Sequence, residues 1–108
     1  MDADRARELL QAERARIERA LRGFAVEDDG EEADDQDPAN LAADLYESEL
    51  DEGMRVDLQA QLEAVERAEA RLEAGTYGLS VKSGEPIPDE RLELLPAAEL
   101  TTEEERER

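Results

Sequence analysis

The 108-residue sequence has no cysteine and no histidine, and its only aromatic residues are Phe24, Tyr46 and Tyr77. Without cysteine there is no disulfide framework, and without either residue type there is no zinc site of the usual Cys/His kind. The same absences exclude cysteine nucleophiles and histidine acid–base catalysis. Because so few aromatic residues are available to line a large apolar pocket, we expect no enzymatic activity.

Long apolar runs are also missing. No stretch approaches the roughly 18 apolar residues that a membrane-spanning helix needs. The first ten residues, MDADRARELL, lack the basic-then-apolar order of a secretory signal. We therefore expect a soluble, cytoplasmic protein that has no membrane contact.

Acidic residues outnumber basic ones by 32 to 13, which gives a net charge of −19. A chain with no excess of cations does not bind DNA directly through a basic surface. The charge is uneven, since residues 27–52 contain thirteen acidic residues and no basic one. Such a block is typical of a solvated loop or an interaction segment. It either only keeps the protein soluble or also presents an acidic surface to a partner.

Two segments have the apolar periodicity of helices. The first, residues 3–26, has its apolar stripe at Ala6, Leu10, Ile17, Leu21 and Phe24. The second, residues 38–74, has its stripe at Leu41, Leu45, Leu50, Met54, Leu58, Leu62, Val65, Ala68 or Glu69, and Leu72, and the phase of the stripe drifts around residues 48–53.

The second predicted helix would be about 55 Å long at 1.5 Å per residue. No small globule encloses such a helix, so its apolar stripe requires a partner, and the first helix is the available one. We therefore expect a mainly α-helical protein with a long antiparallel, coiled-coil-like hairpin over residues 1–74. An acidic loop and tip would occupy residues 27–42.

Residues 75–108 have a different character, with frequent glycine and proline. Tyr77, Leu79 and Val81 alternate as in a short strand, and Pro88 opens a short helix that reaches Leu94. A terminal helix follows, for which two capping boxes have the right spacing: Thr101 with Glu104, or Thr102 with Glu105. We expect a small, separate C-terminal region.

The C-terminal region resembles the DksA/TraR family of bacterial transcription regulators. The matching residues are Gly75-Thr76-Tyr77-Gly78, Gly84-Glu85-Pro86-Ile87-Pro88, Arg91-Leu92 and Pro96-Ala97-Ala98. The family's four zinc cysteines fall here at Ser80, Ser83, Thr101 and Glu104. The resemblance thus implies a degenerate zinc-finger-like knuckle followed by a C-terminal helix.

Two serines, one threonine and one glutamate are not a ligand set that holds zinc, so we expect no metal cofactor. Two features would then hold the knuckle. One is the Thr101–Glu104 capping box. The other is an apolar cluster of Leu79, Val81, Ile87, Leu92, Leu94 and Leu95.

Members of this family bind RNA polymerase rather than DNA, and they insert a helical hairpin with a D-x-x-D-x-A tip motif into the secondary channel. In this sequence Asp37 and Ala42 match the motif, while Asn40 replaces its second aspartate. The resemblance implies a transcription regulator, expected to be monomeric, with polymerase as its partner and these three residues at the tip. Asp37 before Pro38 also has the pattern of a helix N-cap, and both interpretations can hold together.

Two other functions are compatible with the sequence. The change at Asn40 and the missing cysteines suggest a diverged adaptor or stress protein that keeps the fold without regulating polymerase. The acidic composition also suits a nucleic-acid mimic that presents its acidic face to a basic protein.

Overall fold

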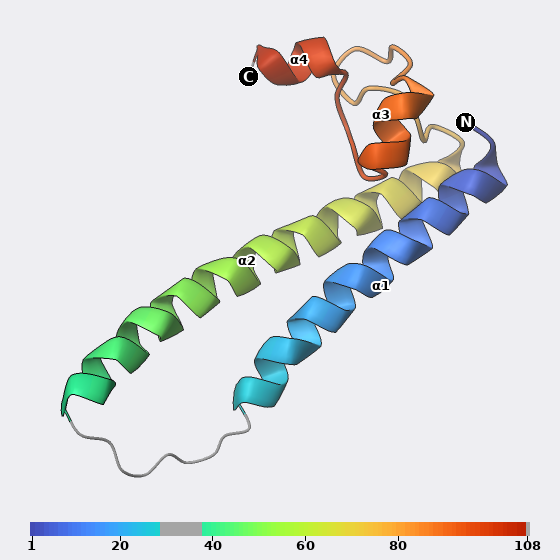
Figure 1. Ribbon diagram of the computed structural model, residues 1–108. Coiled ribbons are helices and arrows are strands. Elements are labelled where there is room, and N and C mark those ends of the chain that lie inside the picture. Colours follow the sequence, from blue (N-terminus) through green and yellow to red (C-terminus); the bar gives the residue numbers. More distant parts are fainter. Residues whose placement is uncertain (29–37, 108) are drawn as a thin grey trace.

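The computed structural model describes residues 1–28 and 38–107, and it shows an elongated molecule built on two long helices (Figure 1). Helix α1 spans Ala3–Asp28 and helix α2 spans Pro38–Ala74. The two run antiparallel and side by side in a molecule that measures 57 × 30 × 20 Å. The predicted helical hairpin is confirmed, and α1 extends two residues beyond its predicted end.

Local sequence signals fix the start of α1 and the end of α2. At the start of α1, the Asp2 carboxylate accepts a hydrogen bond from the N–H of Arg5 at 3.3 Å and so caps one free donor. At the end of α2, Gly75 adopts a φ of 82°, which glycine tolerates best. The N–H groups of Gly75 and Thr76 donate to carbonyls of the last turn at 3.2 and 2.9 Å. This pattern is a Schellman cap, and it stops the helix where the sequence predicts.

A narrow hydrophobic seam joins the two helices near the end where the chain begins. Its fully buried members are Leu10 and Ile17 from α1, with Val65 and Ala68 from α2. Leu10 and Ile17 lie seven residues apart, so both face α2 as in a coiled coil. Leu21 is partly buried and packs against the seam, so the predicted stripe of α1 is confirmed from Leu10 to Leu21.

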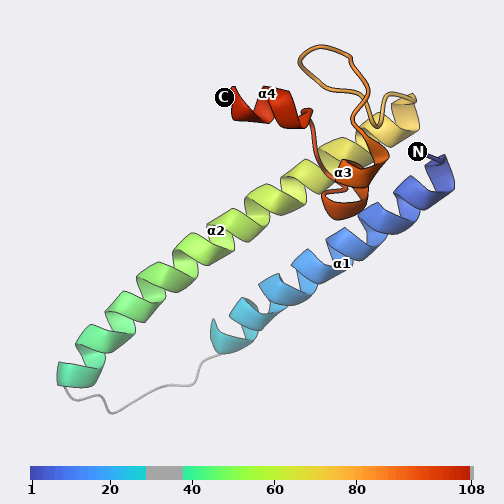
Figure 2. The ribbon, with the colours of Figure 1, turned by 45° about the horizontal axis from the view of Figure 1, so that its top comes forward.

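The seam does not continue along the whole of α2. Leu50 and Met54, which belong to the predicted stripe, are 52 and 51 % exposed. In both ribbon views the two helices diverge toward the end of the hairpin where α1 ends and α2 begins (Figures 1 and 2). An open cleft of about 580 Å³ lies between them there, with Phe24 on the opposite wall. These two members of the predicted stripe therefore line the cleft and are not packed against α1.

Residues 75–107 fold against the end of the hairpin where α1 begins and α2 ends (Figures 1 and 2). They contain two short helices, α3 (Asp89–Leu94) and α4 (Thr102–Arg106). The predicted strand is reduced to one isolated bridge between Leu79 and Pro86, because the chain turns back within a few residues through Gly84, whose φ is 79°. None of the helices described is long and apolar enough to cross a membrane.

The apolar cluster predicted for this region forms only in part. Ile87 and Leu92 are buried, at 3 and 1 % exposure. The other four predicted members lie at the surface: Leu79, Val81, Leu94 and Leu95. Apolar packing alone therefore does not hold the knuckle together, and polar contacts contribute.

Candidate functional site

The predicted tip residues belong to the remote end of the hairpin. Asp37 lies outside the described residues, and so do the side chains of Asn40 and Ala42, whose backbones belong to the first turns of α2. The start of α2 at Pro38 is at the opposite end of that helix from the C-terminal region (Figure 1). The role of the three tip residues stays a prediction.

The four positions where the family carries zinc ligands do meet in space. The carboxylate of Glu104 stands at their centre, and it accepts hydrogen bonds from the Ser80 hydroxyl at 2.6 Å and the Ser83 hydroxyl at 2.5 Å. The backbone N–H of Thr101 donates to the same carboxylate at 3.0 Å, and the Thr101 hydroxyl accepts from the N–H of Glu104 at 3.2 Å. Of the two possible capping boxes, the structure selects Thr101–Glu104.

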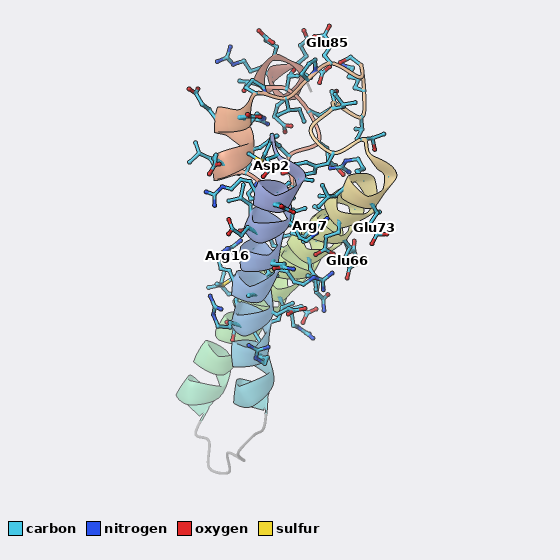
Figure 3. The ribbon with its side chains drawn as sticks, turned by 90° about the vertical axis from the view of Figure 1, so that its right-hand side faces the viewer. Asp2, Arg7, Arg16, Glu66, Glu73 and Glu85 are labelled. Carbon is cyan, nitrogen blue, oxygen red and sulfur yellow. The ribbon has the colours of Figure 1, made fainter. Side chains whose placement is uncertain are left out.

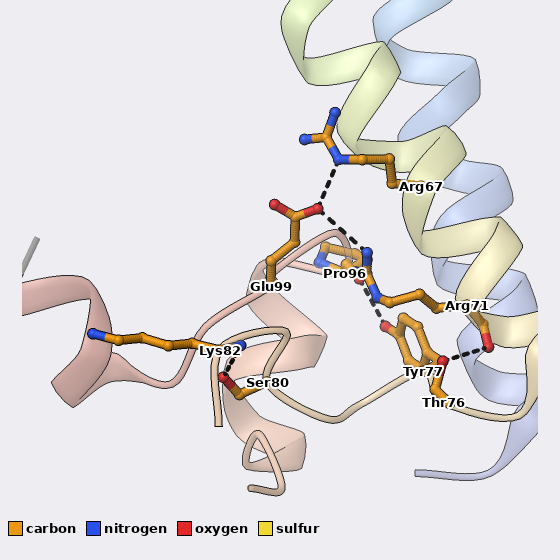
Figure 4. Close-up of polar contacts among 8 residues, drawn as sticks. All are labelled: Arg67, Arg71, Thr76, Tyr77, Ser80, Lys82, Pro96 and Glu99. Carbon is orange, nitrogen blue, oxygen red and sulfur yellow. Dashed lines mark hydrogen bonds and ion pairs between the residues drawn. The ribbon is translucent and has the colours of Figure 1, made fainter. Parts of the chain in front are cut away.

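Ser80 is the buried anchor of this cluster, with 4 % of its surface exposed. Besides donating to Glu104, the hydroxyl group accepts at its oxygen from the N–H of Lys82 at 3.0 Å (Figure 4). It also accepts from the N–H of Ser83 at 3.1 Å. A hydroxyl has one donor and two acceptor sites, so all three are used. A fully satisfied group of this kind can be buried at little cost.

The cluster lowers the pKa of Glu104 from an ordinary value of 4.5 to about 2. The largest causes are the hydrogen bonds from the hydroxyls of Ser80 and Ser83, followed by that from the N–H of Thr101. All of these bonds favour the charged form of the carboxyl group. Glu104 is therefore an ionised acceptor at neutral pH.

This donor set does not fit zinc. Structural zinc sites use thiolates and imidazoles, whereas here three neutral hydroxyls accompany one carboxylate. Two of those hydroxyls donate their protons to Glu104, so the cluster already satisfies itself without a cation. The four residues act as a hydrogen-bonded tie, not as a metal centre.

A second polar group attaches the C-terminal region to α2. The carboxylate of Glu99 accepts from Arg67 at 2.8 Å and from Arg71 at 3.3 Å (Figure 4). The hydroxyl of Tyr77 donates to the carbonyl of Pro96 at 2.8 Å. The pKa of Glu99 is lowered, chiefly by the hydrogen bond from Arg67, and the pKa of Tyr77 is raised by burial.

Ion pairs also connect α1 to its neighbours. Arg5 donates to both carboxylate oxygens of Glu93 on α3, at 2.7 and 3.0 Å, which lowers the pKa of Glu93. Farther along, Arg14 makes the same two-bonded contact with Glu69 of α2, at 2.8 and 3.2 Å. Charged side chains of both long helices line the hairpin (Figure 3), and some pair within one helix, as Arg7 does with Asp4 at 3.1 Å. The C-terminal region is thus attached to both helices.

Sequence reasoning missed the residues of this attachment. Arg67 and Arg71 lie four positions apart and therefore on one helix face, which was an available signal. The Tyr77 and Pro96 pair lies within the motif residues, although their spacing alone does not indicate contact. No sequence signal connects Glu99 to either arginine, because their proximity depends on how the C-terminal region folds back.

Several known proteins are similar to this chain in sequence or in fold. No family model matches the sequence. The chain is 39 % identical to the uncharacterized protein YteA of Bacillus subtilis (strain 168) over 69 residues, which are 64 % of this chain and 29 % of that protein. It is 50 % identical to General stress protein 16O of the same organism over 42 residues, 39 % of this chain and 26 % of that protein. The chain thus spans less than a third of the length of these curated relatives.

A solved structure matches nearly the whole chain. Transcription factor DksA2 from Pseudomonas aeruginosa superposes with a TM-score of 0.84 at 29 % sequence identity, over 97 % of this chain and 81 % of that one. The match includes both the hairpin and the C-terminal region, as its coverage requires. The chain is therefore similar in sequence and in fold to a DksA-like transcription factor, and hydroxyls and a carboxylate occupy the four positions that the resemblance assigns to zinc ligands.

Proposed function

We propose that the chain is a transcription regulator that binds RNA polymerase and inserts its hairpin into the secondary channel, through which nucleotides reach the active site. The observation that carries this proposal is the match to transcription factor DksA2 over 97 % of the chain. The elongated shape supports it, because α2 has 37 residues and the C-terminal region covers only one end of it.

The chemistry of the tip is compatible with such a position. Asp37 lies within the acidic segment 27–52, and a carboxylate there suits the polymerase's Mg²⁺ or the basic side chains that handle nucleotide phosphates. Asn40 keeps the size and one acceptor oxygen of an aspartate but lacks its charge. In this proposal the charge at the tip motif comes from Asp37 alone.

Direct binding to purified core polymerase tests the proposal. Because the chain has no cysteine, one cysteine introduced at the exposed Glu85 accepts a single fluorescent label. We expect labelled protein to bind with a Kd of about micromolar or below. Absence of binding at that concentration would contradict the proposal.

The Asp37→Ala variant tests the role of the tip. We expect it to bind polymerase within about twofold of the wild type, because the other contacts remain, and to lose the effect on transcription measured in vitro. Asp35→Ala is the matched control, since it removes the same charge from the same acidic segment outside the motif. Equal loss of activity in both variants would show that only overall charge matters.

A second candidate function is that of a diverged stress protein without a regulatory effect on polymerase. The 50 % identity to General stress protein 16O over 42 residues favours it. This function predicts that the wild type leaves transcription unchanged. It also predicts that Asn40→Asp, which restores the second aspartate of the motif, produces a new effect.

A further inference from the structure

The arginines of α1 differ in whether a carboxylate neutralises them. Four of them make ion pairs: Arg5, Arg7, Arg14 and Arg16. The other two, Arg19 and Arg22, are exposed, and their side chains make no ion pair or hydrogen bond with the part of the chain that the structure describes. We call these two residues the arginine pair.

The sequence of α1 explains why the arginine pair has no partner within its own helix. Side chains on a helix meet at a separation of three or four positions. None of the four residues at these separations from Arg19 is acidic: Ala15, Arg16, Arg22 and Gly23. For Arg22 the only acidic residue at such a separation is Glu18, which already binds Arg14 at 3.1 Å.

The arginine pair also makes a local exception to the charge of the chain. Residues 19–26 contain both arginines and no acidic residue, although the whole chain has 32 acidic residues and 13 basic ones. Two like charges three positions apart slightly destabilise a helix. The described fold does not compensate this cost, because neither arginine forms a contact with a carboxylate.

The pair lies on the outer side of the hairpin. Ile17 is buried in the seam between the helices, and Arg19 is displaced from it by about 200° around the helix axis. Ala20 and Phe24, in the same stretch of α1, line the open cleft that faces α2. The arginine pair therefore belongs to the half of the hairpin where the helices diverge, away from the C-terminal region (Figures 1 and 2).

We propose that the arginine pair is a contact surface for an acidic patch of RNA polymerase beside the hairpin. This inference rests on the proposed function and adds to it a binding site on the side of the hairpin, separate from the tip. Guanidinium groups bind carboxylates through two parallel hydrogen bonds, and arginine is enriched at protein interfaces. The pair thus offers two cations with unused donors to carboxylates of the partner.

An acidic protein surface fits the arginine pair better than a nucleic acid does. A nucleic acid carries its negative charge along its whole length, and the acidic segment 27–52 that follows the pair would repel it. A local patch of carboxylates needs to approach only the two arginines. At physiological ionic strength, charges more than about 8 Å away are largely screened.

Binding of the labelled Glu85→Cys protein to core polymerase tests the inference. We expect Arg19→Gln/Arg22→Gln in this background to raise the Kd by about tenfold at about 0.1 M NaCl, because both interfacial ion pairs are lost. The ratio of the two Kd values should fall to within about threefold at about 0.5 M NaCl, where salt screens the pairs in the unsubstituted protein. The melting temperature should not fall, since no contact within the described fold is removed.

A second double variant controls for net charge. Arg7→Gln/Arg55→Gln also removes two positive charges, from arginines that pair with Asp4 and Glu52 inside their own helices. We expect it to change the Kd by less than about twofold. An equal loss of affinity in the two double variants would overturn the inference, because only the overall charge would then matter.

The outcomes separate this inference from the proposed function. If the unsubstituted protein does not bind polymerase, the proposed function fails and the inference fails with it. If that protein binds and Arg19→Gln/Arg22→Gln binds equally well, the inference alone is wrong. Binding of duplex DNA that requires both arginines would assign the pair to a nucleic acid and would also overturn it.

Discussion

Glu104 connects parts of the C-terminal region that are distant in sequence. Its carboxylate is bound by hydroxyls 24 and 21 positions earlier, at Ser80 and Ser83, and it caps α4 at the same time. Hydrogen bonds to an ionised acceptor are stronger than those between neutral groups. One acidic residue thereby performs a fastening role that thiolates and a metal perform in zinc-containing folds.

The first prediction at this scale concerns the titration of Glu104 and the stability of the protein at low pH. We expect carboxyl ¹³C NMR to give Glu104 a titration midpoint near pH 2 instead of 4.5. Because its folded pKa lies below its unfolded value, its contribution to stability is full above about pH 4.5 and is lost as the pH falls toward 2. Glu104→Gln removes this dependence. A midpoint at the ordinary value would contradict the assigned hydrogen bonds.

The second prediction concerns the cap of α4. Thr101→Ala removes the hydroxyl that accepts from the N–H of Glu104, and we expect a loss of about 1 kcal/mol in the free energy of unfolding measured in urea. Thr102→Ala is the matched control, since this neighbour is exposed, is the first residue of α4 and accepts a long hydrogen bond from Arg91 at 3.4 Å but does not cap the helix. If both variants lose the same stability, the Thr101 cap contributes nothing of its own.

At the scale of elements, the two long helices are joined unevenly. Near the C-terminal region they share buried side chains and the Arg14–Glu69 contact, whereas toward the other end they diverge around an open cleft. Stability should therefore be concentrated in one half of the hairpin. Backbone amides exchange with solvent more slowly in well-packed parts of a protein than in loosely packed parts, so exchange should be slower in the half of the hairpin near the C-terminal region.

Truncation along the hairpin tests this distribution. Ile17→Ala removes atoms from a side chain that is fully buried, and we expect it to cost about 2–5 kcal/mol in the free energy of unfolding. Leu50→Ala acts on a half-exposed side chain on the predicted stripe and should cost less than about 1 kcal/mol. Similar losses for the two variants in urea denaturation would indicate that the cleft is closed in solution.

At the scale of the whole molecule, the C-terminal region and the hairpin form one unit through separate ties. Glu99 bridges to α2, Glu93 binds Arg5 of α1, and Tyr77 braces the segment that carries Pro96. Each surface ion pair contributes little by itself. Distributed over both helices, however, they fix the direction in which the hairpin projects.

This arrangement predicts that metal chelators do not change the thermal stability of the protein. We expect excess EDTA to leave the melting temperature unchanged, because the positions that hold zinc in the family are satisfied by hydrogen bonds in this chain. Circular dichroism measures the melting curve, and elemental analysis of the purified protein provides the independent check. A large downward shift, or zinc in equimolar amount, would show that the cluster does bind metal.

Local patterns were sufficient for much of the fold. The 3–4 spacing of apolar residues predicted both long helices, and the spacing of Thr101 and Glu104 predicted a cap. These features depend on neighbours within a few positions. The tip residues were placed only by motif resemblance, and their role remains a prediction.

The sequence by itself determined the helical hairpin, the glycine and capping signals, and the absence of any thiolate that would hold zinc. The tertiary structure decided which apolar residues are buried, because Leu92 and Leu94 lie on the same short helix yet only Leu92 faces inward. It also decided that Ser80, Ser83, Thr101 and Glu104 meet and that Glu99 bridges two arginines. Such contacts join distant positions, and only the folded chain specifies which side chains meet there.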